Sequence, residues 1–262
     1  MKPMKKVLTI AGSDCSGGAG VQADIKTITA HKMYAQSVIT ALTAQNTTGV
    51  YGIFNADASF VEKQLDCVFS DIFPDSVKIG MLSDTEIIIS VSEKLKEYGA
   101  KNIVIDPVMI STSGHALISQ NAMAALCGRL IPCAGIITPN IHEAEALCKI
   151  PILNIADMES AAKTLGEKYG TAVLVKGGHL TGDATDVAFI GGEIIHFSAK
   201  RIKNPNTHGT GCTLSSAIAC NLAAGFNMKQ SIKNAKTYVT DAVGAMLDLG
   251  KGSGPLNHMY NL

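Results

Sequence analysis

An excess of charge of either sign is absent from this sequence, whose 262 residues include 22 basic and 22 acidic side chains. Electrostatic attraction drives much of the binding to nucleic acids and anionic membranes, so this balance argues against both partners. No uncharged apolar run reaches the roughly 18 residues that a transmembrane helix needs. The amino terminus, Met1 to Lys6, leads directly into a strand-like segment and does not resemble a signal peptide. We expect a cytoplasmic protein with a small-molecule partner.

A cysteine framework is also lacking. The seven cysteines are odd in number and scattered, and no two form a C-x-x-C pair. This spacing argues against both a disulfide scaffold and a zinc site, and it suits a reducing compartment.

No proline- or serine-rich linker, low-complexity run or internal repeat divides the chain, so we expect one domain over residues 1–262. Apolar β-type runs alternate with helical patterns. This alternation is typical of an α/β protein with a mostly parallel sheet covered by helices on both faces. The predicted strands are Val7–Ala11, Ser37–Leu42, Ser76–Ile79, Asn102–Ile105, Gly135–Thr138 and Ala172–Val175.

One helix has clear start and stop signals. Ser83 and Glu86 have the spacing of a capping box, in which each side chain bonds a backbone N–H of the first turn. The pattern predicts a helix that runs to Tyr98, with Gly99 as its left-handed stop.

The second half of the chain contains a hairpin pattern and a helical tail. The segment Val187–Phe197 reads as two short strands hinged at Gly191-Gly192, which predicts a small antiparallel edge. The tail from Cys212 to Leu249 is predicted to be helical with a break near Gly225-Phe226-Asn227.

The common nucleotide-binding glycine motifs are missing or weak. Gly18-x-Gly20-x-x-Ala23 fits the loose dinucleotide fingerprint, but its glycines lie too far beyond the preceding strand. Thr43-Ala44-Gln45 also stands where an acidic residue for the ribose is needed, so NAD is not expected. No G-x-x-x-x-G-K-[ST] sequence occurs, and any ATP must therefore be held without a Walker A loop.

The most informative pattern is Gly209-Thr210-Gly211-Cys212, which precedes a helix-compatible run from Leu214 to Ala224. Glycine-rich backbone that opens a helix leaves N–H groups unpaired beside the positive end of the helix dipole, so the pattern predicts a phosphate cradle. The same field would lower the pKa of the Cys212 thiol and let it accept a proton. The alternative is a buried structural cysteine above an ordinary glycine loop.

Polar residues also follow three predicted strands. Asn140 and Glu143 have the spacing of a capping box, and Glu143 also offers a carboxylate that suits Mg²⁺ held with phosphates. Asp106 either serves Mg²⁺ or starts a turn before Pro107. Lys176 either neutralises a nucleotide phosphate or is simply solvated.

Taken together, several segments resemble one family, the hydroxymethylpyrimidine/phosphomethylpyrimidine kinases of thiamine synthesis, in the ribokinase-like superfamily. The similarity runs in order from about Val7 to about Leu249. The segments that carry it are Ala11–Asp24, Thr40–Thr47, Lys78–Leu82, Asp106–Met109, Thr138–Ala144 and Asn206–Thr213.

The resemblance implies a three-layer α/β/α ribokinase-like fold and an enzyme that uses MgATP. Its substrate would be 4-amino-5-hydroxymethyl-2-methylpyrimidine, which is phosphorylated once and then again to the diphosphate. In that role Gln45 would hydrogen-bond the aminopyrimidine, and the other residues implied around the ring are Asp24, Gly12, Ala19, Met81 and Val108.

The resemblance also assigns roles around the phosphates. Asn140 and Glu143 would organise Mg²⁺ and the nucleotide, with Asp106 assisting the metal, and Lys176, Gly177 and Gly178 would line the ATP channel. Gly209, Thr210 and Gly211 would form an anion hole, and Cys212 would accept the proton of the substrate hydroxyl.

Two rival functions remain at this point. A pyridoxal kinase of the same superfamily would share the fold, but similar pyridoxal kinases can carry a cysteine in the loop that here is Ile110 to His115. A non-catalytic nucleotide sensor could dispense with several of the site residues present. We also expect Ser111–His115 to act as a flap, and a homodimer to which the apolar alternation around Ser37–Thr43 contributes.

Overall fold

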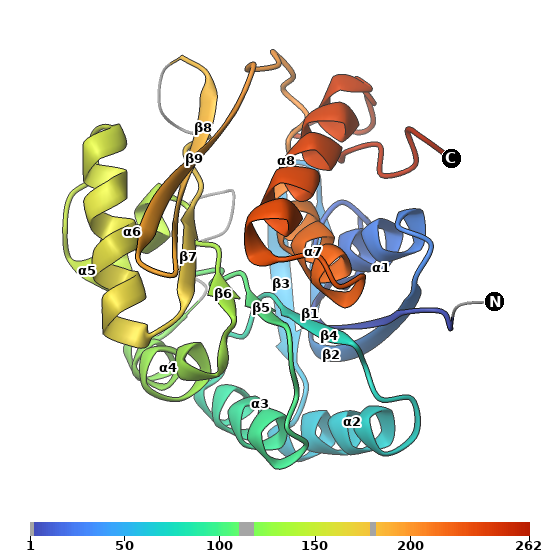
Figure 1. Cartoon of the computed structure of the whole chain (residues 1–262). Helices are drawn as coiled ribbons and strands as arrows, with labels where there is room; N and C mark the ends of the chain where they lie inside the picture. Colours follow the sequence, from blue (N-terminus) through green and yellow to red (C-terminus); the bar gives the residue numbers. More distant parts are fainter. Residues whose placement is uncertain (1–2, 110–117, 179–181) are drawn as a thin grey trace.

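The computed structural model describes residues 3–109, 118–178 and 182–262 (Figure 1). Its strands form one sheet in the order β3-β2-β1-β4-β5-β6-β7-β8-β9. Their bounds are β1 (Lys6–Asp14), β2 (Tyr34–Asn46), β3 (Gly49–Asn55), β4 (Ser76–Ile79), β5 (Ile103–Ile105), β6 (Ile136–Ile137), β7 (Ala172–Val175), β8 (Ala184–Ile190) and β9 (Glu193–Ala199). Neighbours from β2 through β7 pair in parallel, which confirms the predicted mostly parallel sheet.

Antiparallel strands form both edges of the sheet. β8 and β9 make the predicted hairpin, and Gly191 and Gly192 have φ angles of 58° and 93° at its turn. Positive φ at both turn residues matches the twist of a hairpin. The opposite edge strand, β3, pairs with β2 and is not among the predicted strands.

Helices cover both faces of the sheet, as predicted (Figure 1). One face packs on α1 (Gly20–Ala30), α7 (Thr210–Ala223) and α8 (Met228–Gly244). The other face packs on α2 (Ala58–Asp71), α3 (Thr85–Glu97), α4 (Gln120–Ala125), α5 (Ile141–Cys148) and α6 (Ile155–Tyr169). The three-layer α/β/α architecture follows from this arrangement.

Strand residues alternate between the two apolar layers. In β5, Val104 lies in the core with α7 and α8, whereas Ile103 and Ile105 lie in the core with α2 to α6. Leu174 and its neighbours in β7 divide in the same way. A central parallel strand buried on both faces is mostly apolar, which is why β5 and β7 read as continuous apolar runs.

The start of α3 differs from the prediction. Asp84, and not Ser83, caps the helix, because its Oδ1 accepts from the backbone N–H of Glu86 at 2.9 Å and of Ile87 at 3.1 Å. Ser83 instead donates to the side chain of Asn55 at 3.1 Å. The left-handed stop at Gly99 is confirmed, with φ of 61°.

The helical tail is confirmed with its break. α7 ends at Ala223 and α8 begins at Met228, capped by Asn227. The second helix stops at Gly244, short of the predicted Leu249.

The flap predicted at Ser111–His115 lies outside the residues that the structure describes. Across the described ranges, no helix combines the length and apolarity needed to cross a bilayer.

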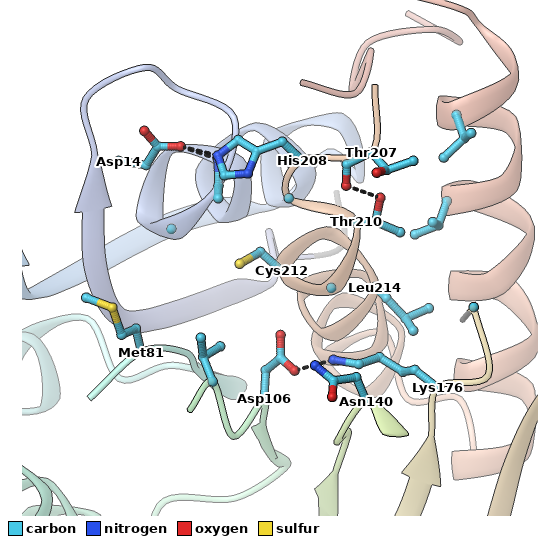
Figure 2. Close-up of a pocket in the computed structure, with 18 of the residues that line it drawn as sticks. Asp14, Met81, Asp106, Asn140, Lys176, Thr207, His208, Thr210, Cys212 and Leu214 are labelled. Carbon is cyan, nitrogen blue, oxygen red and sulfur yellow. Dashed lines mark hydrogen bonds and ion pairs between the residues drawn. The ribbon is translucent and has the colours of Figure 1, made fainter. Parts of the chain in front are cut away.

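The topology brings the polar residues together. β1, β4, β5, β6 and β7 run in parallel, so their carboxyl ends meet at one edge of the sheet. Open α/β sheets bind ligands at this edge. The first turn of α7 approaches the same edge (Figure 2).

Candidate active site

A cavity of about 570 Å³ lies along the carboxyl edge of the sheet. Its volume falls within the range of small-molecule sites. It is lined by most of the residues predicted for the site, namely Gly12, Ala19, Gln45, Met81, Asp106, Val108, Asn140, Glu143, Lys176, Gly178, Gly209, Thr210, Gly211 and Cys212. The structure therefore brings together side chains that are far apart in the sequence.

The glycine loop before α7 is shaped by close backbone contacts. Gly209 has φ of 83° and is the N-cap of α7, and a Cβ there would overlap the carbonyl oxygen of Gly18. A Cβ on Gly211 would lie 3.3 Å from both Asp106 Oδ2 and Lys176 Nζ. Gly209 therefore requires glycine, and Gly211 lets the first turn of α7 approach the Lys176–Asp106 pair closely.

Cys212 lies half-buried in the first turn of α7 and points into the cavity (Figure 2). Burial raises the pKa of its thiol to about 11; Lys78 lowers this pKa, while Asp24 and Asp106 raise it. The predicted lowering of the Cys212 pKa is therefore wrong for the free protein, because loss of solvent outweighs the helix dipole. The thiol is neutral at pH 7 until a ligand changes its surroundings.

Lys176 and Asp106 form an ion pair of 2.6 Å between Nζ and Oδ1 (Figure 2). Asp106 is 2% exposed and also accepts from the hydroxyl of Thr138 at 3.2 Å. Lys176 is thus not a solvated surface lysine, and Asp106 does more than start a turn.

Glu143 has a structural and an electrostatic role. The capping box is confirmed, since Asn140 N donates to Glu143 Oε2 at 2.8 Å and Glu143 N donates to Asn140 Oδ1 at 2.9 Å. Burial raises the pKa of Glu143 to about 7; Lys176 lowers this pKa and Asp106 raises it. A buried carboxyl held near neutrality would gain from a nearby cation.

The described residues contain no cluster of three or more His, Cys, Asp or Glu side chains placed to hold a metal ion. Mg²⁺ does not need such a cluster, because it commonly binds one or two carboxylates and takes its other ligands from phosphates and water. The oxygen donors of Asp106 and Glu143 fit this mode.

Asp24 is the main departure from the predicted site. It is fully buried and does not line the cavity. Its carboxylate pairs with Lys78 Nζ at 2.7 Å and accepts from the hydroxyls of Thr9 at 2.6 Å and Ser216 at 2.7 Å. Asp24 therefore cannot contact a ligand in this structure, whereas Lys78, which has no predicted role, lines the cavity.

Gly177 also lies behind the cavity wall. Its N–H donates to Asp186 Oδ1 at 2.9 Å, and a Cβ there would overlap the carbonyl oxygen of Thr185. Asp186 pairs with Lys236 Nζ at 2.6 Å, so this glycine joins β7 to a buried ion pair next to the cavity. Beyond it the lining includes an apolar wall of Ile202, Leu214, Val239 and Val243, with Lys200, Arg201 and Thr240 beside it.

A second cluster of polar side chains, which the local sequence does not predict, joins the loop after β1 to the loop before α7. His208 Nε2 lies 2.8 Å from Asp14 Oδ2 (Figure 2). Gln45 Nε2 lies 3.1 Å from the same His208 nitrogen. His208 is part of the motif around Gly209, but nothing in the local pattern reveals a partner 194 residues away.

Comparison with known proteins agrees with this geometry. The family model described as phosphomethylpyrimidine kinase matches residues 14–257. A hydroxymethylpyrimidine/phosphomethylpyrimidine kinase from Rhizobium meliloti is 46% identical over 257 residues, covering 97% of this chain and 96% of that protein.

Two other relatives extend the comparison. A thiamine biosynthesis bifunctional protein from Geobacter sulfurreducens is 48% identical over 98% of this chain, and the chain spans about half (53%) of that protein's length. A pyridoxal kinase from Bacillus subtilis, solved as an ADP complex, is 35% identical with a TM-score of 0.91 over 98% of each chain.

The matched residues include the loop before α7, the loop that follows β1, and all of the parallel strands except β1, of which only Asp14 is matched. Identity to the pyrimidine kinase is higher than to the pyridoxal kinase, although both share the fold. The chain belongs to the phosphomethylpyrimidine kinase family.

Proposed function

We propose that this chain is an ATP-dependent kinase that phosphorylates the hydroxymethyl group of 4-amino-5-hydroxymethyl-2-methylpyrimidine and then converts the monophosphate to the diphosphate. One observation carries the proposal. A single cavity runs from Gln45 and Met81 past Cys212 to Lys176 and the apolar wall on α8, so an acceptor and a nucleotide can meet at the glycine loop (Figure 2).

The acceptor would occupy the end lined by Gly12, Ala19, Gln45, Met81 and Val108. A Cβ on Gly12 would lie 2.7 Å from the terminal methyl of Met81, so glycine lets this methionine approach the strand closely. The result is a narrow, mainly apolar slot with one side-chain amide. Such a slot suits a flat heteroaromatic ring with polar groups on one edge.

Phosphoryl transfer needs alignment and positive charge more than covalent chemistry. The N–H groups at Gly209 and Gly211 would stabilise the oxygens of the transferring group, and Lys176 would also contact them. The N–H of Thr210, predicted for the same role, donates to the carbonyl oxygen of Thr207 at 3.2 Å in this structure. Once bound ligands have lowered its pKa, the Cys212 thiol would release its own proton to water, and the resulting thiolate would take up the proton of the substrate hydroxyl.

The nucleotide would occupy the end at Lys176, Gly178 and the apolar wall formed by Leu214 and α8. Mg²⁺ would be held by Glu143 and Asp106, and Asn140 would position Glu143 through the capping box. The metal would neutralise charge on the phosphates when bound.

Mass analysis of the products tests the proposal directly. With MgATP and hydroxymethylpyrimidine, we expect masses for one and then two added phosphoryl groups. Bound but unconverted pyrimidine would instead support a nucleotide sensor, and would contradict the proposal.

Pyridoxal is the second candidate acceptor, since the pyridoxal kinase from Bacillus subtilis has a TM-score of 0.91 to this chain. We propose that it is at most a side substrate, because the loop Ile110–His115 contains no thiol to capture its aldehyde. Measuring the specific activity on hydroxymethylpyrimidine and on pyridoxal distinguishes the two candidates. A large preference for pyridoxal would overturn this choice.

The working unit would be a homodimer formed through the β2–β3 edge. Apolar side chains stand exposed along this edge, with Tyr51 69%, Phe54 72% and Leu42 53% exposed, and Phe60 of α2 beside them 58% exposed. A second copy would remove them from water. Val50 and Ile53 of β3 also line the cavity, so a dimer here would border the acceptor end.

A further inference from the structure

We propose that His208 is a positioning residue that fixes which end of the Gln45 amide accepts and which end donates a hydrogen bond. The inference deepens the proposed function, because Gln45 lines the acceptor end of the cavity. It depends on the cluster of Asp14, His208, Gln45 and Thr43.

The first step concerns the proton on His208. Asp14 is 3% exposed, and besides facing His208 it accepts from Ser16 N at 2.9 Å, the Ser16 hydroxyl at 2.7 Å and Ala19 N at 2.8 Å. Burial raises the pKa of Asp14, but these bonds together with His208 hold that pKa well below its usual range. Asp14 is therefore an ionised acceptor, and His208 Nε2, 2.8 Å away, must carry a proton and donate it.

The second step concerns Gln45. In this structure Gln45 Nε2 is the end that lies 3.1 Å from this same His208 Nε2, and with a proton on His208 this arrangement places two donors face to face. An oxygen at that end would share the Nε2 proton with Asp14. The two ends of an amide have nearly the same shape, so a half-turn about the last side-chain bond exchanges them without moving any neighbour.

Thr43, at the other end of the Gln45 amide, favours the same orientation. Its hydroxyl lies 2.9 Å from the carbonyl oxygen of Ser13 and 3.3 Å from Gln45. A carbonyl oxygen can only accept, so the single hydroxyl proton of Thr43 is committed to Ser13. Thr43 Oγ1 can then only accept from Gln45, which places the NH₂ group of Gln45 at this end.

The structure places Gln45 Nε2 toward His208 and Gln45 Oε1 toward Thr43. The two partners both favour the reverse orientation of this amide, with Gln45 Oε1 toward His208 and Gln45 Nε2 toward Thr43. The remaining lone pair and the remaining N–H are left for a ligand. A 4-aminopyrimidine offers an exocyclic N–H donor beside a ring-nitrogen acceptor, which matches this fixed pair. The amino group would lie on the His208 side and the ring nitrogen on the Thr43 side.

The His208 proton can be observed without turnover. In protein labelled with ¹⁵N-histidine, we expect the His208 Nε2 signal, assigned by its absence from His208→Gln, to have the shift of a protonated ring nitrogen at pH 7. A shift typical of an unprotonated nitrogen would overturn the inference, whatever the protein phosphorylates.

Substrate discrimination tests the consequence. The probe is the 4-oxo analogue of the hydroxymethylpyrimidine, in which the exocyclic group accepts and the adjacent ring nitrogen donates. We expect the wild-type chain to prefer the amino compound in kcat/KM by roughly 100-fold or more, because mismatched buried polar groups are left unpaired.

Two variants separate positioning from folding. His208→Leu removes the donor, and we expect the amino-to-oxo preference to fall at least tenfold, whereas His208→Gln keeps an N–H at this place and should retain it within a few fold. An unchanged preference in His208→Leu would overturn the inference. Turnover of neither compound by the wild-type chain would instead contradict the proposed function, and the nitrogen spectrum would still decide the role of His208.

Discussion

Burial controls the chemistry of individual residues at this site. Cys212 and Glu143 both have raised pKa values, to about 11 and about 7, because each lies in a cavity wall with little access to water. Neither shift is visible in the local sequence. Both groups are neutral or partly neutral in the free protein, and a bound nucleotide and metal would alter this balance.

The Cys212 shift predicts slow alkylation at neutral pH. The thiolate is the reactive form, so the rate with iodoacetamide should rise about tenfold per pH unit up to roughly pH 11. At pH 8 we expect Cys212 to react at least tenfold more slowly than the exposed Cys67, as measured by peptide mass spectrometry. Cys212 reacting faster than Cys67 at pH 8 would contradict this prediction.

The proton-accepting role of Cys212 predicts a loss of turnover in Cys212→Ala at saturating substrates. We expect kcat to fall about tenfold or more, since a loose transfer needs limited help from a base. Wild-type turnover in this variant would rule out the base role and leave only the anion hole for the loop.

The raised pKa of Glu143 predicts that removing its charge increases stability and decreases activity. The folded chain keeps the proton up to about pH 7, whereas the ordinary pKa is 4.5, so the folded state binds more protons between these values. Its contribution to the free energy of unfolding therefore falls as pH rises through this window. Glu143→Gln keeps the capping acceptor but no charge, so at pH 8 we expect it to be more stable by about 1 to 3 kcal/mol.

Urea unfolding of Glu143→Gln and the wild-type chain at pH 4 and pH 8 measures this effect, and the stability difference should shrink at pH 4. Turnover with MgATP should fall in the variant, because the proposed metal ligand is lost. A variant less stable than wild type at pH 8 would show that burial does not dominate at Glu143.

At the scale of single elements, the junction between the Gly209 loop and α7 positions the N–H groups of the proposed anion hole. Gly209→Ala adds a methyl group against the Gly18 carbonyl at a φ of 83°, so the first turn of α7 must move. A displacement of about 1 Å costs on the order of 100-fold in rate, and we expect that loss in kcat/KM.

Gly225→Ala is the matched control. Its φ is 92°, but a Cβ there meets nothing within 4 Å, so the substitution adds only backbone strain of about 1–2 kcal/mol. We expect it to lower thermal stability and leave kcat/KM nearly unchanged. Equal activity in the two variants would show that the Gly209 contact does not set the position of the loop.

For the whole molecule, the exposed β2–β3 edge predicts the oligomeric state. Phe54→Glu places a charge in the middle of the proposed interface, where it would be costly to bury. We expect light scattering after gel filtration to give twice the 27.4 kDa chain mass for wild type and the single mass for the variant. Phe226→Glu, at an exposed position between α7 and α8, is the control and should remain dimeric. A monomeric wild-type chain would contradict the proposed homodimer.

Much of the architecture follows from local patterns. β7 occurs at the predicted residues, because a strand buried on both faces favours a short apolar run. β4 also occurs at the predicted residues, although two of its four buried residues, Ser76 and Lys78, are polar. The Asn140 capping box, the turn at Gly191-Gly192 and the stop at Gly99 also follow from the residue types that such geometry requires. In contrast, β3 is mostly exposed and is held by pairing with β2, so its own residues do not reveal it.

The site likewise contains some features that local sequence predicts and others that it does not. Glycines that open a helix, a carboxylate after a strand and a lysine after a strand can be read from a few adjacent residues, and these groups line the cavity. The ion pair of Lys78 with Asp24 joins positions 54 apart, and the pair of His208 with Asp14 joins positions 194 apart. Partner choice, burial and the resulting pKa values depend on which strands and loops become neighbours in space, and only the folded chain decides that.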